Sequence, residues 1–121
     1  MDENKITPEL LYQFLILNIL IKAGGSAERC RVLDTIKRDY WQFLTDEDKS
    51  EYQSGHGERW KNHISFAREH LKGNGYLRKD SPMGLWEITD EGRKKHKEWL
   101  EFIKENYDKE LLLNEKMPKV Q

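Results

Sequence analysis

The sequence contains little cysteine, little proline and no long uninterrupted apolar run, and each shortage excludes a class of protein. Cys30 is the only cysteine, so neither a disulfide framework nor a cysteine-based zinc site can form within one chain. We expect Cys30 to be an ordinary buried or half-buried thiol of a cytoplasmic protein, because free cysteine behaves as a small hydrophobe. The apolar run over residues 14–21 is interrupted by Asn18 and is too short to span a bilayer. We therefore expect a buried helix there, and no membrane partner.

Sequence patterns for catalysis are also missing. The chain has no glycine-rich phosphate loop and no nucleophile elbow. No two of its four histidines are spaced four residues apart, as a helical metal site would require. His63 and His70 are seven residues apart on one predicted helix face, but no cysteine lies near them to complete a site. We therefore expect a protein that is not an enzyme and that holds neither a cofactor nor a metal ion.

The charge of the chain is nearly balanced in total but not along its length. Its 121 residues include 21 basic and 22 acidic side chains, a formal net charge of −1. Residues 1–55 have a net charge of −3, residues 56–97 of +4 and residues 98–121 of −2. A segment with a basic excess is the part of a chain that an anionic partner would meet. The middle of this chain is therefore where we expect a polyanion to bind.

The first third of the chain predicts two helices. Thr7 can cap the first helix and Pro8 can occupy its first turn, and the helix ends near Ala23, before Gly24-Gly25. Its apolar side chains occupy several sides, so it is buried either inside the domain or against a partner subunit. Ser26 is placed to cap the second helix. The apolar positions on one face of that helix are Cys30, Leu33, Ile36 and Tyr40.

Three helical segments and a hairpin are predicted after residue 44. Residues 45–48 resemble a capping box with aspartate in place of glutamate, and a third main helix runs from about Glu58 to Lys72. Strand periodicity then appears at 76–79 and 85–89, with a turn between them. Thr89 or Asp90 caps the last, long helix. Its apolar positions are Trp99, Phe102, Ile103 and Tyr107.

Helices followed by a two-stranded hairpin and a further helix give the outline of a winged helix-turn-helix. We therefore predict a mainly α fold with a small β-hairpin and an extended C-terminal helix. We place the chain in a single domain over residues 1–121, with a core from about 7 to 107 and a tail over 108–121. In such a fold the helix before the hairpin can enter the major groove of DNA.

One stretch of the sequence resembles a known family. It contains the pairs Arg59-Trp60, Ala67-Arg68 and Leu71-Lys72, then Gly75-Tyr76-Leu77, Gly84-Leu85-Trp86-Glu87-Ile88-Thr89 and Glu91-Gly92-Arg93. These residues resemble the N-terminal winged-helix domain of Mrr-type restriction endonucleases. With the Ile-Lys-Ala-Gly-Gly turn at 21–25, the resemblance spans most of residues 10–97.

The resemblance implies a DNA-binding domain that, in that family, recruits a nuclease to DNA that is often modified. The family's catalytic domain would follow, whereas this sequence stops at Gln121. We therefore expect either a free-standing DNA-binding protein or the front end of a longer nuclease.

The predicted third helix carries the main candidate site. At 100° per residue, Trp60, Ile64, Ala67 and Leu71 form a core-facing stripe. On the opposite side, Asn62 and Ser65 are short polar groups able to meet base edges. The candidate phosphate contacts on this helix are Arg59, Lys61, Arg68 and Lys72. The alternative is a solvated helix face, and the carboxylates of Glu58 and Glu69 favour that alternative because they repel phosphate.

Two further basic groups flank this helix in sequence. Arg78 and Lys79 lie on the predicted hairpin, where a basic wing adds phosphate or minor-groove contacts. They could instead be charges that protect an edge strand from aggregation. Arg93, Lys94 and Lys95 begin the last helix, where cations oppose the helix dipole, and this suggests phosphate binding. We expect Trp86 to pack in the core rather than stack on a base.

The sequence therefore predicts a non-catalytic protein that binds double-stranded DNA, as the specificity module of a restriction-type system or as a regulator. The alternative is a winged helix that binds protein, an adaptor or dimerisation module. Apolar excess in the first helix and at 111–113 slightly favours a homodimer. A nuclease domain or subunit is a further expected partner.

Overall fold

The computed structural model of the protein describes residues 9–51 and 57–106, with side chains as far as Ile103 in the last helix. The predictions made for Thr7, Pro8, Tyr107 and the apolar residues 111–113 lie outside these ranges. The described elements are α1 (Glu9–Lys22), β1 (Ser26–Glu28), α2 (Arg29–Thr35), a π-helical turn η1 (Ile36–Tyr40), a 3₁₀ turn η2 (Trp41–Phe43), α3 (Asp46–Lys49), α4 (Arg59–Gly73), β2 (Leu85–Glu87) and α5 (Asp90–Asn106).

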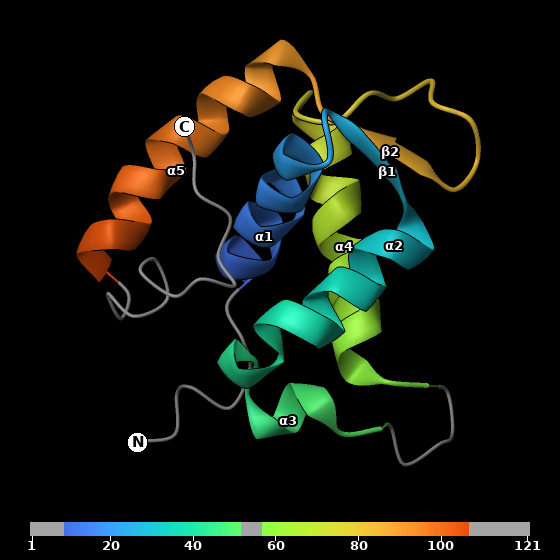
Figure 1. Cartoon of the computed structure of the whole chain (residues 1–121), viewed down its shortest axis with the longest axis vertical. Helices are drawn as coiled ribbons and strands as arrows, with labels where there is room; N and C mark the ends of the chain where they lie inside the picture. The colour runs from blue at the N-terminus through green and yellow to red at the C-terminus, as the bar shows by residue number, and fades with distance from the viewer. Residues whose placement is uncertain (1–8, 52–56, 107–121) are drawn as a thin grey trace.

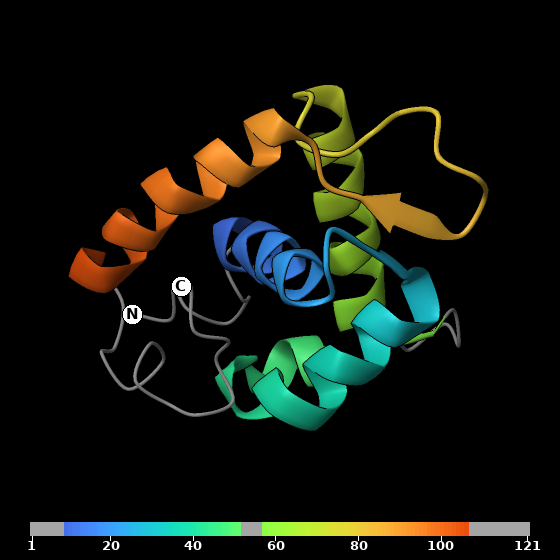
Figure 2. The same cartoon turned by 45° about the horizontal axis from the view of Figure 1, so that its top comes forward.

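Helix α1 forms the centre of the molecule. It lies between α4 and α5, with α2 packed against its C-terminal part (Figures 1 and 2). From Leu11 to Leu20 every side chain except that of Gln13 is buried. A helix that is apolar on several sides must be covered on several sides, and here the domain's own helices cover it. Of the two alternatives for the first helix, burial inside the domain is the one observed.

The sheet is the main difference from the sequence-based prediction. β1 pairs antiparallel with β2, with Ala27 opposite Trp86. Within the described residues, the first strand of the predicted hairpin is reduced to a single bridge between Leu77 and Ile88, extended by a hydrogen bond from the Arg78 N–H to the Glu87 carbonyl (2.9 Å).

Ser26 was predicted to cap the second helix, and that prediction is wrong. Gly24 and Gly25 have φ of 94° and 118°, which redirects the chain into extended backbone, and Ser26 becomes the first residue of β1. Glu28 then precedes α2, and its side chain makes no capping hydrogen bond.

Cys30 is exposed, which also corrects the sequence-based prediction. The buried side chains in the first two turns of α2 are Val32 and Leu33. Cys30 is on the outer side of the helix, where its Sγ lies 3.9 Å from a carboxylate oxygen of Glu28.

The predicted helix starts at α3 and α5 are confirmed. Thr45 caps α3 by accepting a hydrogen bond from the Asp48 N–H (3.2 Å), and Thr89 caps α5 by accepting one from the Gly92 N–H (2.9 Å). The whole is a mainly helical winged helix-turn-helix with a small antiparallel sheet and a long last helix. In the described part of the chain, no helix combines the length and the apolar character that crossing a membrane requires.

Candidate nucleic-acid interface

Helix α4 has one buried and one exposed face. Trp60, Ile64, Ala67 and Leu71 are buried against α1 and the rest of the core, as the stripe in the sequence predicts. The opposite face exposes Lys61, Asn62, Phe66 and Glu69. Ser65 is half-buried beside them, and its hydroxyl donates to the Lys61 carbonyl (3.1 Å). The helix before the wing therefore presents short polar groups outward on a rigid support.

The carboxylates on this helix are paired with its own cations. Lys61 Nζ lies 3.0 Å from Glu58, and hydrogen bonds from Lys61 and Trp60 hold the pKa of the Glu58 carboxyl below its ordinary value. Glu69 forms ion pairs with two cations through the same carboxylate oxygen, Oε2. This oxygen lies 2.8 Å from a terminal nitrogen of Arg68 and 3.7 Å from Lys72 Nζ. The two acidic groups that would repel phosphate are thus neutralised locally.

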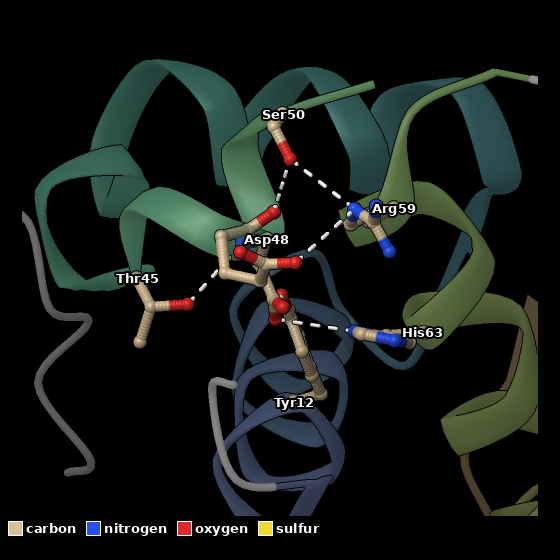
Figure 3. A network of polar contacts seen from close by, with 7 residues as sticks. Tyr12, Thr45, Asp48, Ser50, Arg59 and His63 are labelled. Carbon is tan, nitrogen blue, oxygen red and sulfur yellow. Dashed lines mark hydrogen bonds and ion pairs between the residues drawn. The ribbon is translucent and has the colours of Figure 1, made fainter. Parts of the chain in front are cut away.

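Arg59 does not join the other candidate residues. Its Nε donates to the Ser50 hydroxyl (3.2 Å) and lies 3.6 Å from Glu47, so the side chain points toward α3 (Figure 3). On a helical wheel it is far from the flank that holds Lys61, Arg68 and Lys72. The structure therefore gives Arg59 a role in joining the start of α4 to α3.

A buried carboxylate strengthens that same junction. Asp48 of α3 is fully buried, and its Oδ2 accepts a hydrogen bond from the Tyr12 hydroxyl (2.6 Å) and lies 3.2 Å from His63 Nδ1 (Figure 3). One side chain thereby connects α3 to both α1 and α4. The sequence analysis missed this residue, because an aspartate in a polar stretch has the same local pattern as a solvated one.

The wing is the loop over residues 78–84, between the Leu77 bridge and β2. Arg78 lies 3.2 Å from Asp80, and this hydrogen bond holds the pKa of the Asp80 carboxyl below its ordinary value. Lys79 is exposed, and within the described residues its side chain has no partner. Met83, near the end of the loop, is fully exposed.

A groove separates the wing from α4, and we call it the α4–wing groove. Arg68, Ser65 and Met83 line it together with Arg29 of α2 and Trp86 of β2. The Arg68 guanidinium lies 5.5 Å from the centre of the buried Trp86 ring. Trp86 is therefore a core residue, as expected.

Arg29 was not a candidate in the sequence analysis. Its place on the groove depends on the β1–β2 pairing, which brings the wing against the start of α2. No local sequence signal indicates that pairing.

The basic residues at the start of α5 lie near the C-terminal end of α4 (Figures 1 and 2). Lys95 Nζ lies 2.8 Å from Glu98 and 5.6 Å from the centre of the Tyr76 ring, and Lys94 lies 3.6 Å from Glu91. Arg93 is exposed, with a terminal nitrogen close to Gly25. These three residues form a second basic group, separate from the α4–wing groove.

No group of three or more histidine, cysteine, aspartate or glutamate side chains in the described residues is arranged to hold a metal ion.

The fold defines a winged-helix protein, and a comparison of sequences defines its family. The model of the Mrr N-terminal domain matches residues 12–98, which reach from α1 into α5. The chain belongs to the Mrr N-terminal domain family, as its resemblance indicated. Neither the curated proteins nor the solved structures gave a match.

Proposed function

We propose that this protein binds double-stranded DNA and does not itself catalyse a reaction, with α4 in the major groove and the wing beside it. The observation that carries the proposal is the division of α4 into a deeply buried stripe and an exposed polar face. A recognition helix needs a buried stripe and an exposed polar face, because the buried stripe fixes the position of the polar face against the bases. Membership of the Mrr N-terminal domain family supports the proposal.

The ion pairs on α4 do not oppose this function. Lys61 and Lys72 are paired with carboxylates at or near the surface, where such pairs contribute about 0–1 kcal/mol. Exchanging a carboxylate for a phosphate therefore costs little. In this proposal Asn62 and Ser65 meet base edges, and Lys61 and Lys72 meet the flanking phosphates.

Within a restriction system, the domain would bring a nuclease domain or subunit to its DNA site, and a modified base is a candidate for what it recognises. A role as a regulator uses the same DNA contacts. In either role we expect a cytoplasmic protein.

Fluorescence anisotropy on labelled duplexes tests the proposal. The duplexes are unmodified or methylated at adenine or cytosine, and each is titrated at two salt concentrations. We expect binding that weakens as salt rises, because neutralised phosphates release counterions. A preference for one methylated duplex would assign the protein to modification-dependent restriction.

The control compares two cations in different parts of the structure. Lys72→Ala should weaken binding, whereas Arg31→Ala, on the outer side of α2 in a separate pocket, should not. Absence of binding even at low salt would contradict the proposal.

A protein-binding role is the second candidate, and one observation favours it. Phe66 is 55% exposed in the middle of the outward face of α4. An apolar ring there suits a protein partner, although it also suits a thymine methyl group in the major groove. A protein that binds no duplex would direct the search toward such a partner.

A homodimer stays a prediction. One of the two observations that favoured a homodimer was the apolar excess of α1. In the structure α4 and α5 of the same chain cover these apolar side chains. Among the described residues of α5, Phe102 is 44% exposed and would be the apolar contact. Sedimentation equilibrium measures the state directly.

A further inference from the structure

The wing is held at a fixed distance from α4 by contacts with α2. The Arg29 N–H donates to the Gly84 carbonyl at 2.8 Å, and β1, directly before Arg29, pairs with β2, directly after the wing. The end of the wing therefore does not swing freely. The α4–wing groove lies between two elements that the fold keeps apart.

Met83 is the most exposed large apolar side chain among the described residues. It projects completely into solvent beside the α4–wing groove, between Pro82 and Gly84. Met83 does not contribute to the hydrophobic core, because its side chain is fully exposed. An apolar group held out by a constrained loop is suited to contact a partner.

We propose that one phosphodiester strand of the bound duplex lies in the α4–wing groove and that Met83 enters the minor groove beyond it. This inference rests on the proposed function. In B-form DNA a single backbone strand separates the major groove from the neighbouring minor groove. If α4 occupies the first and the wing reaches the second, that strand has to pass between them.

The side chains lining the groove fit a phosphate. Within the described residues, the guanidinium of the exposed Arg29 has no partner. Contact with Trp86 keeps the Arg68 guanidinium in place. Glu69 also lines the groove, but Arg68 and Lys72 both neutralise its carboxylate. The groove therefore has a net positive charge where the strand would lie.

The chemistry of Met83 identifies the kind of DNA. Apolar side chains that enter the minor groove act as wedges, which partly separate two stacked base pairs and bend the duplex. Pyrimidine–purine steps such as TA separate most easily. We expect the wing to prefer a duplex that has such a step one groove away from the α4 contact.

The experiment uses the tightest-binding duplex from the anisotropy assay and permanganate, which oxidises thymine where it is unstacked and leaves the minor groove unaltered. Wild-type protein should raise the permanganate reactivity of thymine at a single step by about twofold or more, and Met83→Ala should abolish the rise. Met83→Leu should restore it, whereas Phe102→Ala, which alters an exposed apolar residue on α5, should not affect it.

A second measurement identifies the groove. Replacing adenine by 2,6-diaminopurine at the responsive step adds an amino group that projects only into the minor groove. The substitution should weaken binding of the wild-type protein several-fold and leave binding of the Met83→Ala variant unchanged. For the strand contact, Arg29→Ala should reduce the salt dependence by about one phosphate, and Arg31→Ala should not.

The possible failures are distinct. If wild-type protein binds duplex but unstacks no step, and Met83→Ala binds as wild type does, this docking geometry is overturned and DNA binding stands. If wild-type protein binds no duplex at all, both the geometry and the proposed function are overturned.

Discussion

His96 is a fully buried imidazole between α5 and α1. Its Nε2 donates to the Asn18 side-chain oxygen (2.7 Å), and its ring stacks on Phe14 with 4.9 Å between the centroids. In the described residues its Nδ1 is buried without a hydrogen-bond partner. Burial lowers the pKa of His96 from 6.5 to about 4, because a charged ring would lose its hydration. The folded protein therefore holds this histidine neutral.

That lowered pKa makes stability depend on pH. Between pH 6.5 and 4 the unfolded chain binds a proton at His96 that the folded chain does not, so stability falls as the pH is lowered through this range. At pH 4.5 the loss should be about 2–3 kcal/mol relative to pH 8.

Urea unfolding at several pH values measures the effect. His96→Gln keeps a donor for Asn18 but does not titrate, so it should lack this share of the acid destabilisation. Equal pH dependence in the two proteins would contradict the assignment.

Asn62 is the residue on which sequence discrimination should depend. It is exposed in the first half of α4, opposite the buried stripe, and its amide suits the two hydrogen-bonding groups of adenine. Asn62→Ala should reduce discrimination between the preferred duplex and a single-base variant by about 1–3 kcal/mol. Anisotropy competition between the two duplexes measures the change, and equal losses on both would exclude base recognition by Asn62.

Single residues were predictable where a periodic pattern decides their environment. The stripe through Trp60 and Leu71 follows from helical spacing, and Trp86 follows from strand alternation. Arg29 and Asp48 were missed because residues distant in sequence create their surroundings. Cys30 was misplaced because the buried face of α2 contains Val32 as well as Leu33, and Cys30 lies on the far side of Leu33 from Val32 on the helical wheel.

Gly92 is required where α5 begins. A β-carbon at this position would lie 2.3 Å from the Tyr76 carbonyl oxygen and 2.8 Å from a side-chain carbon of Ile88. The first of these is backbone and cannot move aside cheaply. The start of α5 therefore approaches the segment after α4 more closely than any side chain allows.

Gly92→Ala should destabilise the protein by about 1–3 kcal/mol, as overpacking does. Gly73→Ala is the matched control. It lies at the end of α4 with open space around its position, so alanine there should be neutral or stabilising by up to about 1 kcal/mol. Thermal unfolding of both variants gives the comparison, and similar changes in the two would show that close packing at Gly92 is unimportant.

Helices and strands were predictable where the residues that determine them are close together in the sequence. The caps at Thr45 and Thr89 depend on residues three positions away, and both were found from sequence. β1 is only three residues long and depends on a partner strand almost sixty positions later, so it was read as the start of a helix. Loop geometry such as the wing depends on the same distant pairing.

At the scale of the molecule, a net charge of −1 does not prevent binding to a polyanion, because the basic excess is confined to residues 56–97. The Debye length at physiological salt is about 8 Å, so the acidic remainder of the chain is largely screened from a strand lying on this segment. The residues at the start of α5 extend the basic surface beyond α4.

Replacing both Lys94 and Lys95 by alanine should weaken binding to every duplex to a similar degree and lower the salt dependence by up to two phosphates. The control is the double variant Lys22→Ala and Arg31→Ala, which removes the same charge from the separate pocket between α1 and α2. Titrations at several salt concentrations provide the slopes. A change in sequence preference, rather than a uniform loss, would contradict a phosphate role.

The pairing of β1 with β2 has a consequence for how the protein is made. Translation produces residues 26–28 long before residues 85–87, so the backbone groups of β1 have no strand partner on the ribosome until α4 has been synthesised. The nascent chain can assemble α1, α2 and α4 around their apolar faces first. The sheet, and with it the placement of the wing against α2, closes only as the final helix begins to emerge.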